Sequence, residues 1–455
     1  MQNNKDMQQW AALAKSRMPA GRGMFLQHIS LWQELGANDF LQRKMPLALT
    51  VPPPQFHCDI KSLDTHLVSV CNGFATGRAG QNLLFPEQKA ALGDKPCVCR
   101  LSDLSEGERN QLQAFFAHSE TAEKQSGKVR RTADFAEVRC EPDTEDFARL
   151  NRSFTPETLV VYLPAGCRLE KPLQIVNLCI GDEALFLQPH CLMLLEKGAS
   201  LSLVHCTDSH PKADILANAL TEIRLEPGAS LEYIQMQNVG DRCKIFHQIQ
   251  AEVLSGARLS LHRITLNGGI TQNNTEVNLL QEGARAEVFG LYLQDREQKT
   301  DNRVKINHIA PQTYSRELFK GVMDDSAEAY FKGHVFVSPQ AQQTEAYQSC
   351  RNLLVSPKAQ AYAKPYLEIY ADDVQCNHGV TVGQLDEDAL FYMRCRGISA
   401  DSARRLLMRA YADEILKEIG VEELRLWLTS LVKKRFSGQL QACQECILAC
   451  PGGEC

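Results

Sequence analysis

Leu195-Glu-Lys-Gly198-Ala-Ser-Leu201 is the first of four related segments in this 455-residue chain. The others are Leu225-Glu-Pro-Gly228-Ala-Ser-Leu231, Leu254-Ser-Gly256-Ala-Arg-Leu259 and Leu280-Gln-Glu-Gly283-Ala-Arg-Ala286, so the Gly-Ala pairs lie 30, 28 and 27 residues apart. A repeat of this length indicates stacked structural units. Since each unit contains strand-like segments and a glycine turn but no helical pattern, the sequence predicts a mainly β chain built as a parallel β-helix.

The segments around these turns alternate between apolar and polar side chains, as half-buried strands do. Residues 158–163, 201–205, 231–235 and 259–262 show this pattern. Glycine at each turn allows a positive φ, and stacking buries the apolar face of every coil. We expect the solenoid to cover residues 151–383 and to continue through 304–306, 330–331, 334–337 and 366–370. An antiparallel sandwich of short strands is the alternative.

Helical periodicity flanks this region on both sides. Residues 7–35 fit two short helices and 102–118 another, so residues 1–150 are predicted to be mixed and helix-rich, with a charged, exposed linker over 119–145. After residue 383 the helical period returns, with Ser399 or Asp401 as a cap for a helix to Leu416 and a further helix over 421–436. We therefore expect a helical domain over 384–436 and a flexible, cysteine-rich tail over 437–455.

Composition excludes several classes of protein. With 49 basic and 55 acidic residues, the chain has a net charge of -6. It therefore lacks the excess of positive charge that nucleic-acid binding requires. No apolar run approaches the roughly 20 residues of a membrane span, and the first residues lack the pattern of a signal peptide, so we expect a cytoplasmic protein. The 17 cysteines are an odd number spread along the chain, which favours reduced thiols that act as ligands or redox groups.

Cys376 and His378 lie in an extended segment between the predicted solenoid and the helices. Residues two apart in a strand share a face, so their side chains point the same way, together with Val374 and Val380. A thiolate and an imidazole are good ligands for iron, zinc or a cluster, yet two donors leave a site incomplete, so further ligands must come from elsewhere or from another subunit. From spacing alone, a buried cysteine and a hydrogen-bonded core histidine are the better interpretation.

Longer motifs change that interpretation. From about residue 301 to 416 the chain resembles the SufB/SufD family of iron–sulfur cluster assembly proteins, and the Cys-x-His-Gly-x-Thr-Val-Gly form of one motif resembles the SufD branch. The resemblance is weaker over residues 150–300 and weakest over the first 150. It is carried by Lys320-Gly-Val322, Phe331-Lys-Gly-His334, Leu367-Glu-Ile-Tyr-Ala-Asp-Asp373, Cys376-Asn-His-Gly-Val-Thr-Val-Gly383 and Leu390-Phe-Tyr-Met-Arg-Cys-Arg-Gly397-Ile398.

The resemblance implies a right-handed parallel β-helix flanked by helical domains, which pairs with SufB through its last coils while each of the two subunits carries one SufC ATPase. A transient iron–sulfur cluster would be assembled at the junction, with His378 as a ligand and Cys376 as a second interface thiol. The helical region after Asp386 would bind SufC, and we expect its contact residues to be Leu390, Phe391, Tyr392, Arg396, Ala403, Leu407 and Ala410. The sequence contains no Gly-x-x-x-x-Gly-Lys-Ser/Thr phosphate loop, so we expect no bound nucleotide and no catalysis by this subunit.

Three further hypotheses stay open at this point. The tail thiols Cys443, Cys446, Cys450 and Cys455 resemble a ferredoxin run with one altered spacing, and they either bind iron or are bystanders. Parallel β-helices also include carbohydrate lyases and hydrolases, which is the alternative function. An unpaired last coil would allow the isolated chain to form a homodimer. Cys97-Val-Cys99, His205, His262, His308 and His334 are weaker candidate ligands.

Overall fold

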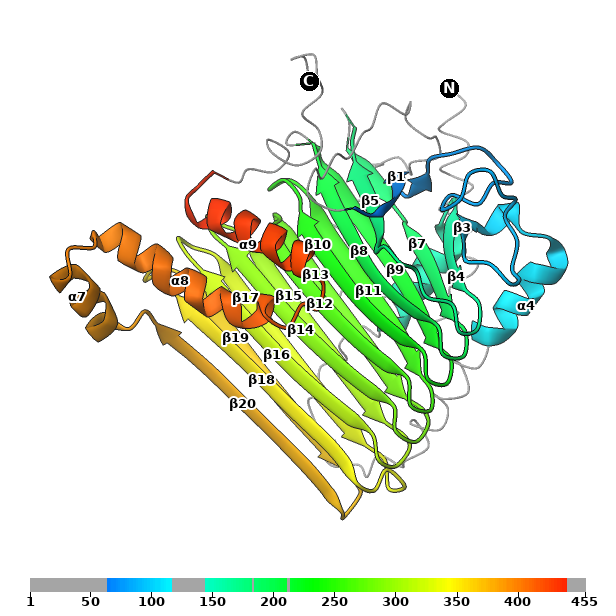
Figure 1. Ribbon diagram of the computed structural model, residues 1–455. Coiled ribbons are helices and arrows are strands. Elements are labelled where there is room, and N and C mark those ends of the chain that lie inside the picture. Colours follow the sequence, from blue (N-terminus) through cyan, green and yellow to red (C-terminus); the bar gives the residue numbers. More distant parts are fainter. Residues whose placement is uncertain (1–63, 117–143, 182–183, 211–212, 440–455) are drawn as a thin grey trace, which may run out of the picture.

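The computed structural model describes residues 64–116, 144–181, 184–210 and 213–439. Strands that follow one another in the sequence alternate between two sheets, which wind into one long β-solenoid (Figure 1). Every neighbouring pair from β4 to β20 is parallel. The parallel β-helix is therefore confirmed as the architecture, and the antiparallel sandwich is wrong.

We call the two sheets sheet I and sheet II, and each has ten strands within the described residues. Sheet I runs in the order β2 (Phe74–Ala75), β1 (His66–Cys71), β5 (Leu173–Cys179), β8 (Ser200–Ser209), β10 (Ser230–Asn238), β12 (Arg258–Asn267), β14 (Arg285–Gln294), β16 (Tyr314–Met323), β18 (Thr344–Leu354) and β20 (Val374–Gln384). Sheet II consists of β19 (Gln360–Ile369), β17 (Glu328–Val337), β15 (Lys299–His308), β13 (Ile270–Leu279), β11 (Lys244–Val253), β9 (Ile215–Leu225), β7 (His190–Leu195), β4 (Thr158–Leu163) and β3 (Cys97–Arg100), with β6 (Leu185–Leu187) paired to β9.

The repeated glycines occupy one column of corners between the sheets. Gly198, Gly228, Gly256 and Gly283 all have φ between 63° and 74°, the left-handed region that glycine adopts without a steric penalty. The corners of later coils use Gln312 and Gln343 at φ 56° and 59° instead. The turn geometry thus continues beyond the point where the glycine repeat ends.

Alternation along each strand separates two apolar layers. In β14 the side chains of Ala286 and Val288 point into the solenoid, where they join a core that lies between the two sheets. Phe289, Leu291 and Leu293 belong to a second apolar cluster shared with the carboxyl-terminal helices. Both faces of this part of sheet I are therefore buried, which explains its long apolar runs.

Within the described residues, α7 (Glu387–Cys395), α8 (Ala400–Leu416) and α9 (Glu422–Phe436) follow the solenoid, and α8 and α9 match the two helices predicted there. Ser399 caps α8 by accepting a hydrogen bond from the backbone N–H of Ser402. The helices α8 and α9 cover the outer face of sheet I, whereas α7 projects past its edge (Figure 1).

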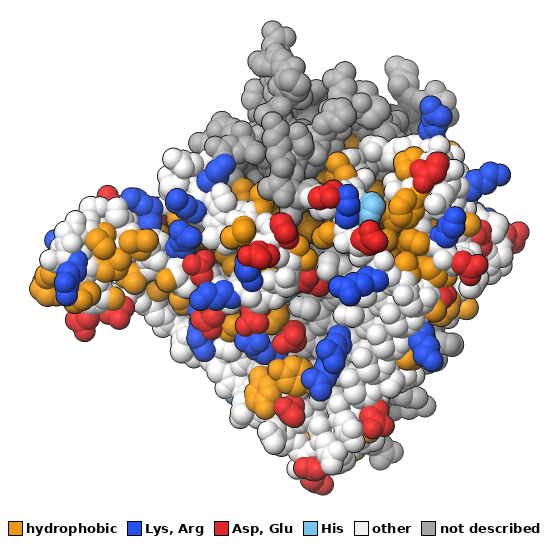
Figure 2. Space-filling model, viewed as in Figure 1, with side chains coloured by type: hydrophobic (Ala, Val, Ile, Leu, Met, Phe, Trp, Pro, Cys, Tyr) orange, Lys and Arg blue, Asp and Glu red, His pale blue; other side chains and the backbone are white. Residues whose placement is uncertain are grey.

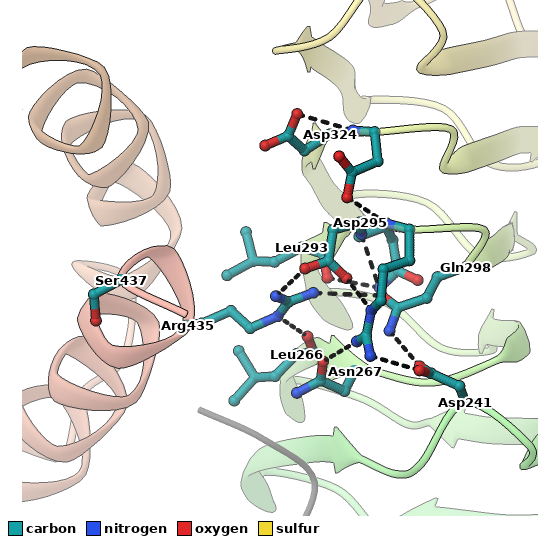
Figure 3. Close-up of polar contacts among 12 residues, drawn as sticks. Asp241, Leu266, Asn267, Leu293, Asp295, Gln298, Asp324, Arg435 and Ser437 are labelled. Atoms are coloured by element: carbon teal, nitrogen blue, oxygen red, sulfur yellow. Dashed lines mark hydrogen bonds and ion pairs between the residues drawn. The ribbon is translucent and has the colours of Figure 1, made fainter. Parts of the chain in front are cut away.

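A buried arginine attaches α9 to the turns of the solenoid (Figure 3). Arg435 donates hydrogen bonds to the carbonyl oxygen of Leu266 at 2.7 Å and to the carboxylate of Asp295 at 2.5 Å. Burial alone would raise the pKa of Asp295, but its hydrogen bond to Arg435 and the charge of Arg435 outweigh burial and lower it. This helix and the solenoid therefore form one unit.

The described part of the amino-terminal region contains both helices and strands. It contains η2 (Leu101–Asp103), α4 (Glu106–Phe116) and α6 (Thr144–Phe154), but β1 continues sheet I and β3 continues sheet II at the end of the solenoid opposite β20. The two short helices expected within residues 7–35, the linker over 119–145 except for the start of α6, and the cysteine tail from Cys443 lie outside the described residues.

Candidate functional site at the open end of the solenoid

In the part of the chain that the structure describes, the last coil has a neighbour on one side alone. Within the described part of the chain, β20 pairs with β18 and β19 pairs with β17, and no strand lies beyond either of them. Figure 1 shows β20 as the free edge of the stack. Such an edge presents unpaired backbone N–H and C=O groups and is a template for pairing with another chain.

Cys376 and His378 lie on the inward face of this edge strand. Their Cα partners in β18 are Ala346 and Gln348, which are both buried. The side chain of Cys376 packs against the apolar cluster at this end of the interior, whereas His378 is exposed. Burial raises the pKa of the Cys376 thiol above its usual value. The thiol and the imidazole are thus neighbours at the mouth of the solenoid, as the spacing predicts.

Within the described residues, these two donors have no further ligand close enough to complete a metal site. Among the residues that the structure describes, no three side chains of His, Cys, Asp or Glu lie close enough together to hold a metal ion. Two donors at an exposed edge can contribute to a site that a second protein completes.

The motif Lys320-Gly321-Val322 serves both faces of sheet I. Lys320 is 3% exposed on the outer face, where its ammonium forms an ion pair with Glu414 of α8 and lies 4.0 Å from the centre of the Tyr411 ring. Gly321 faces inward, and a Cβ atom there would lie 2.1 Å from the ring of Tyr292. This motif therefore fixes α8 outside and leaves room for a tyrosine inside.

The motif Phe331-Lys-Gly333-His334 likewise has side chains on both faces of its sheet, which is sheet II. Phe331 is buried in the interior core, and Gly333 leaves room for the side-chain amide of Gln348 from the opposite sheet. His334 contacts the Glu368 carboxylate at 3.1 Å and the ring of Tyr366. Both partners lie on β19, and Glu368 belongs to the motif 367–373. Residues of these motifs thus meet at the last two coils.

The predicted contact residues on the helices are divided between surface and interior. Phe391, Tyr392, Arg396 and Ala410 are exposed, and Leu407 is partly buried. Leu390 and Ala403 are buried within the chain itself, with exposed fractions of 7% and 0%. Figure 2 shows hydrophobic side chains on the projecting tip formed by α7. Phe391 and Tyr392 of α7 are exposed apolar residues, and so is Leu406 of α8, which the sequence analysis did not select.

The weaker candidates have partners inside the chain. His205 bonds to Tyr233 at 2.9 Å, His262 to Ser260 at 3.1 Å, and His308 to Thr313 and Ser315. Burial lowers the pKa of His205 to about 4 and those of His262 and His308 to about 3. Cys97 and Cys99 are buried in β3. These groups are interior side chains.

Two interior residues near the site escaped the sequence analysis. Glu317 is 1% exposed and accepts a hydrogen bond from the Gln348 amide at 3.0 Å, directly behind His378. Burial raises the pKa of Glu317 to about 8. No motif marks either residue, because in a solenoid the residues that share a column are about 30 positions apart in the sequence.

Comparisons with known proteins agree with this architecture. The SufBD core domain of the SUF system for iron–sulfur cluster assembly matches residues 178–411, and the SufBD amino-terminal region matches residues 33–175. The chain belongs to the SufBD family. Its core match covers the solenoid from β6 onward, the open end and α7 with most of α8.

Individual relatives share this assignment. Over 315 residues the chain is 31% identical to an iron–sulfur cluster assembly SufBD family protein of Synechocystis sp., covering 66% of each. It is 30% identical to the chloroplast protein ABCI7 of Arabidopsis thaliana, covering 61% of this chain and 60% of that protein. It is 27% identical to the iron–sulfur cluster assembly protein SufD of Escherichia coli, covering 65% and 70%. The matched stretches thus span about two thirds of these relatives.

The family assignment agrees with the expected role in iron–sulfur cluster assembly. Eleven cysteines in the described residues are free thiols, among them Cys376 and Cys395. None of the helices that the structure describes is long and apolar enough to cross a membrane.

Proposed function

We propose that this chain is a SufD-like scaffold subunit that pairs with a SufB-like subunit through its last coil. Together they build and transfer an iron–sulfur cluster, which is the cargo of the complex. The observation that carries this proposal is the placement of Cys376 and His378 on the inward face of the unpaired edge strand β20. Similarity to the SufD protein of Escherichia coli supports the choice of this branch.

The site is shared between two subunits. This chain contributes the imidazole of His378 as an iron or cluster ligand, with Cys376 as a second donor, and the partner supplies the rest. Burial keeps the Cys376 thiol protonated in the lone chain, so binding of a metal must displace its proton. Completion of the ligand set therefore depends on the partner and on the metal.

The carboxyl-terminal helices bind a SufC-like ATPase. A docking surface formed by Phe391, Tyr392, Leu406 and Arg396 offers exposed aromatic and aliphatic groups next to a cation, a composition typical of interface hot spots. ATP is hydrolysed by that partner, and this chain binds no nucleotide and catalyses no reaction. We place the protein in the cytoplasm, where its thiols stay reduced.

Two substitutions test the ligand role in the co-expressed complex purified without oxygen. His378→Ala and Cys376→Ala remove one donor each without opening a large cavity, since the first side chain is exposed and the second is small. We expect bound iron and sulfide to fall several-fold while the partners still co-purify. Asn377→Ala is the matched control, because this exposed side chain lies between them on the same strand. Unchanged iron and sulfide in His378→Ala would remove the ligand role.

The carbohydrate-active alternative is tested by the partners. A tagged chain that retains an ATPase and a second SufBD protein from its native extract supports the scaffold role. Turnover of a polysaccharide by the purified lone chain would contradict it.

A further inference from the structure

One column of interior side chains changes from apolar to polar as it approaches the open end. Residues in register from β8 to β14 are Leu203, Tyr233, Leu261 and Val288, which belong to the main core. The next three residues of the same column are Glu317, Gln348 and His378. The polar part of this column thus ends at the predicted ligand.

Gln348 occupies space that the opposite sheet leaves free for it. Its side chain is 3% exposed, and a Cβ atom on Gly333 would lie within 2.2 Å of its Nε2 and 2.8 Å of its Oε1. The amide donates from Nε2 to Glu317 at 3.0 Å, while its Oε1 is buried and accepts no hydrogen bond. Oε1 of Gln348 and Oε1 of Glu317 are therefore the two buried oxygens of this pair that have no hydrogen-bond partner in the structure.

A buried amide oxygen without a donor costs about 1–3 kcal/mol, and interior polar atoms are therefore nearly always paired. The residue that follows Gln348 in the column is His378, which lies on the side where no further strand of the described residues covers the interior. Neighbouring columns offer no such acceptor to the last strand. The side chain behind Cys376 is Ala346, and the one behind Val380 is the thiol of Cys350.

We propose that Gln348 is a positioning residue for His378: rotation of the exposed imidazole toward the interior brings a ring N–H to the free Oε1 of the Gln348 amide, which has no donor in the structure. Glu317 orients this amide by accepting a hydrogen bond from its nitrogen. The hydrogen bond fixes the tautomer and the direction of the imidazole, so the other ring nitrogen faces outward with its lone pair free for a metal. The inference rests on the proposed function for the identity of that metal, but the hydrogen bond itself does not.

The burial of Glu317 is consistent with this arrangement. Its raised pKa of about 8 keeps the carboxyl group mostly neutral near neutral pH, so no uncompensated charge lies in the apolar interior. A neutral carboxyl group and an amide can therefore stay buried behind the exposed histidine as a fixed polar support.

The test is nuclear magnetic resonance of the full chain with 15N-labelled histidine, in which the His378 signals are assigned by their loss in His378→Ala. Wild-type protein should show one dominant tautomer of His378. Gln348→Met keeps the length of the side chain but removes the acceptor, so both tautomers should appear. Cys350→Ala, on the same strand and the same face, is the matched control and should leave the His378 signals unchanged.

Restoring the acceptor should restore the signal. The exchange Glu317→Gln with Gln348→Glu keeps a carboxyl–amide pair in the column and should return His378 to one tautomer. In the co-expressed complex, Gln348→Met should weaken iron binding about 10-fold, the effect typical of a lost hydrogen bond to a ligand. If Gln348→Met does not fold, Gln348→Asn, which moves the amide inward by one bond, is measured in the same way.

The two proposals fail in different ways. Identical His378 signals in wild type and Gln348→Met would overturn the positioning role, whatever the iron content of the complex. Unchanged cluster content in His378→Ala would overturn the ligand role and leave the tautomer result standing.

Discussion

Gly333 of β17 and Gln348 of β18 face each other across the interior, and a Cβ atom on Gly333 would lie 2.2 Å from the Gln348 amide nitrogen. Gly333→Ala should therefore push this amide out of its hydrogen bond with Glu317. We expect a loss of about 2 kcal/mol in the free energy of unfolding, measured by chemical denaturation. Gly383→Ala is the control, since nothing lies within 4 Å of its added Cβ atom. Equal stability of both variants would contradict the packing argument.

Glu317 should make stability depend on pH. Its pKa is raised by burial to about 8 in the folded chain, so the folded state binds more protons than the unfolded state between roughly pH 4.5 and 8. Stability therefore falls as pH rises through this window and levels off above it. Glu317→Gln should remove this slope. The free energy of unfolding of the variant relative to wild type should therefore be higher at pH 8 than at pH 4.5 by on the order of 4 kcal/mol. Chemical denaturation of both proteins at several pH values measures this difference. Parallel plots of unfolding free energy against pH for wild type and variant would refute the prediction.

Two substitutions at corners with positive φ should change stability in opposite directions, because one introduces glycine and the other removes it. Gln343 has φ 59° and is exposed, so Gln343→Gly should raise stability by about 1 kcal/mol by relieving backbone strain. Gly256 has φ 63° and open space around it, so Gly256→Ala should lower stability by a similar amount through the backbone alone. Thermal unfolding compares the two, and a shift of the same sign in both would contradict this account.

Lys320 should hold α8 on the solenoid. Lys320→Met leaves Glu414 without its buried partner and removes the contact with Tyr411, which should cost about 2 kcal/mol. Amide hydrogen exchange should become faster in α8 than in the strands beneath it. Lys417→Met, at an exposed position at the end of the same helix, serves as the control. Unchanged exchange in α8 would show that the apolar contacts suffice.

The projecting helix should determine capture of the ATPase. Phe391 and Tyr392 are 69% and 59% exposed, so replacing both by serine should not affect folding but should reduce retention of the ATPase about tenfold or more in a pull-down. Leu426→Ser changes an equally exposed apolar residue on α9 and should have no effect. Retention of the ATPase by the double variant would place the docking surface elsewhere.

Much of the solenoid could be predicted because each coil repeats one pattern. The Gly-Ala corners from Gly198 to Gly283 identify the period, and the alternating strands define the interior. Beyond Gly283 the corners use Gln312 and Gln343, so the repeat becomes invisible although the geometry continues. The strands β1 and β3 were missed because they are short and their apolar pattern is completed by distant partners, β5 and β4.

The site was predictable in part for the same reason. Cys376 and His378 are two residues apart on one strand, so local spacing places them together. Gln348 and Glu317 reach the site through register across strands, and Gly333 through packing across sheets, which no local pattern reveals. On α8, the exposed and buried faces depend on the tilt of the helix against sheet I, so Ala403 was selected although it lies inside.

The missing neighbour of β20 has a consequence for quality control of assembly. A coil that is supported on one side alone opens more readily than a coil inside the stack, so in the lone subunit Cys376 and His378 should lie in a segment with fast amide exchange. Docking of the proposed companion would close the backbone ladder and surround both side chains in a single event. On the proposed function, an orphaned subunit would then be exposed to degradation before it captures iron, and the completed pair would persist.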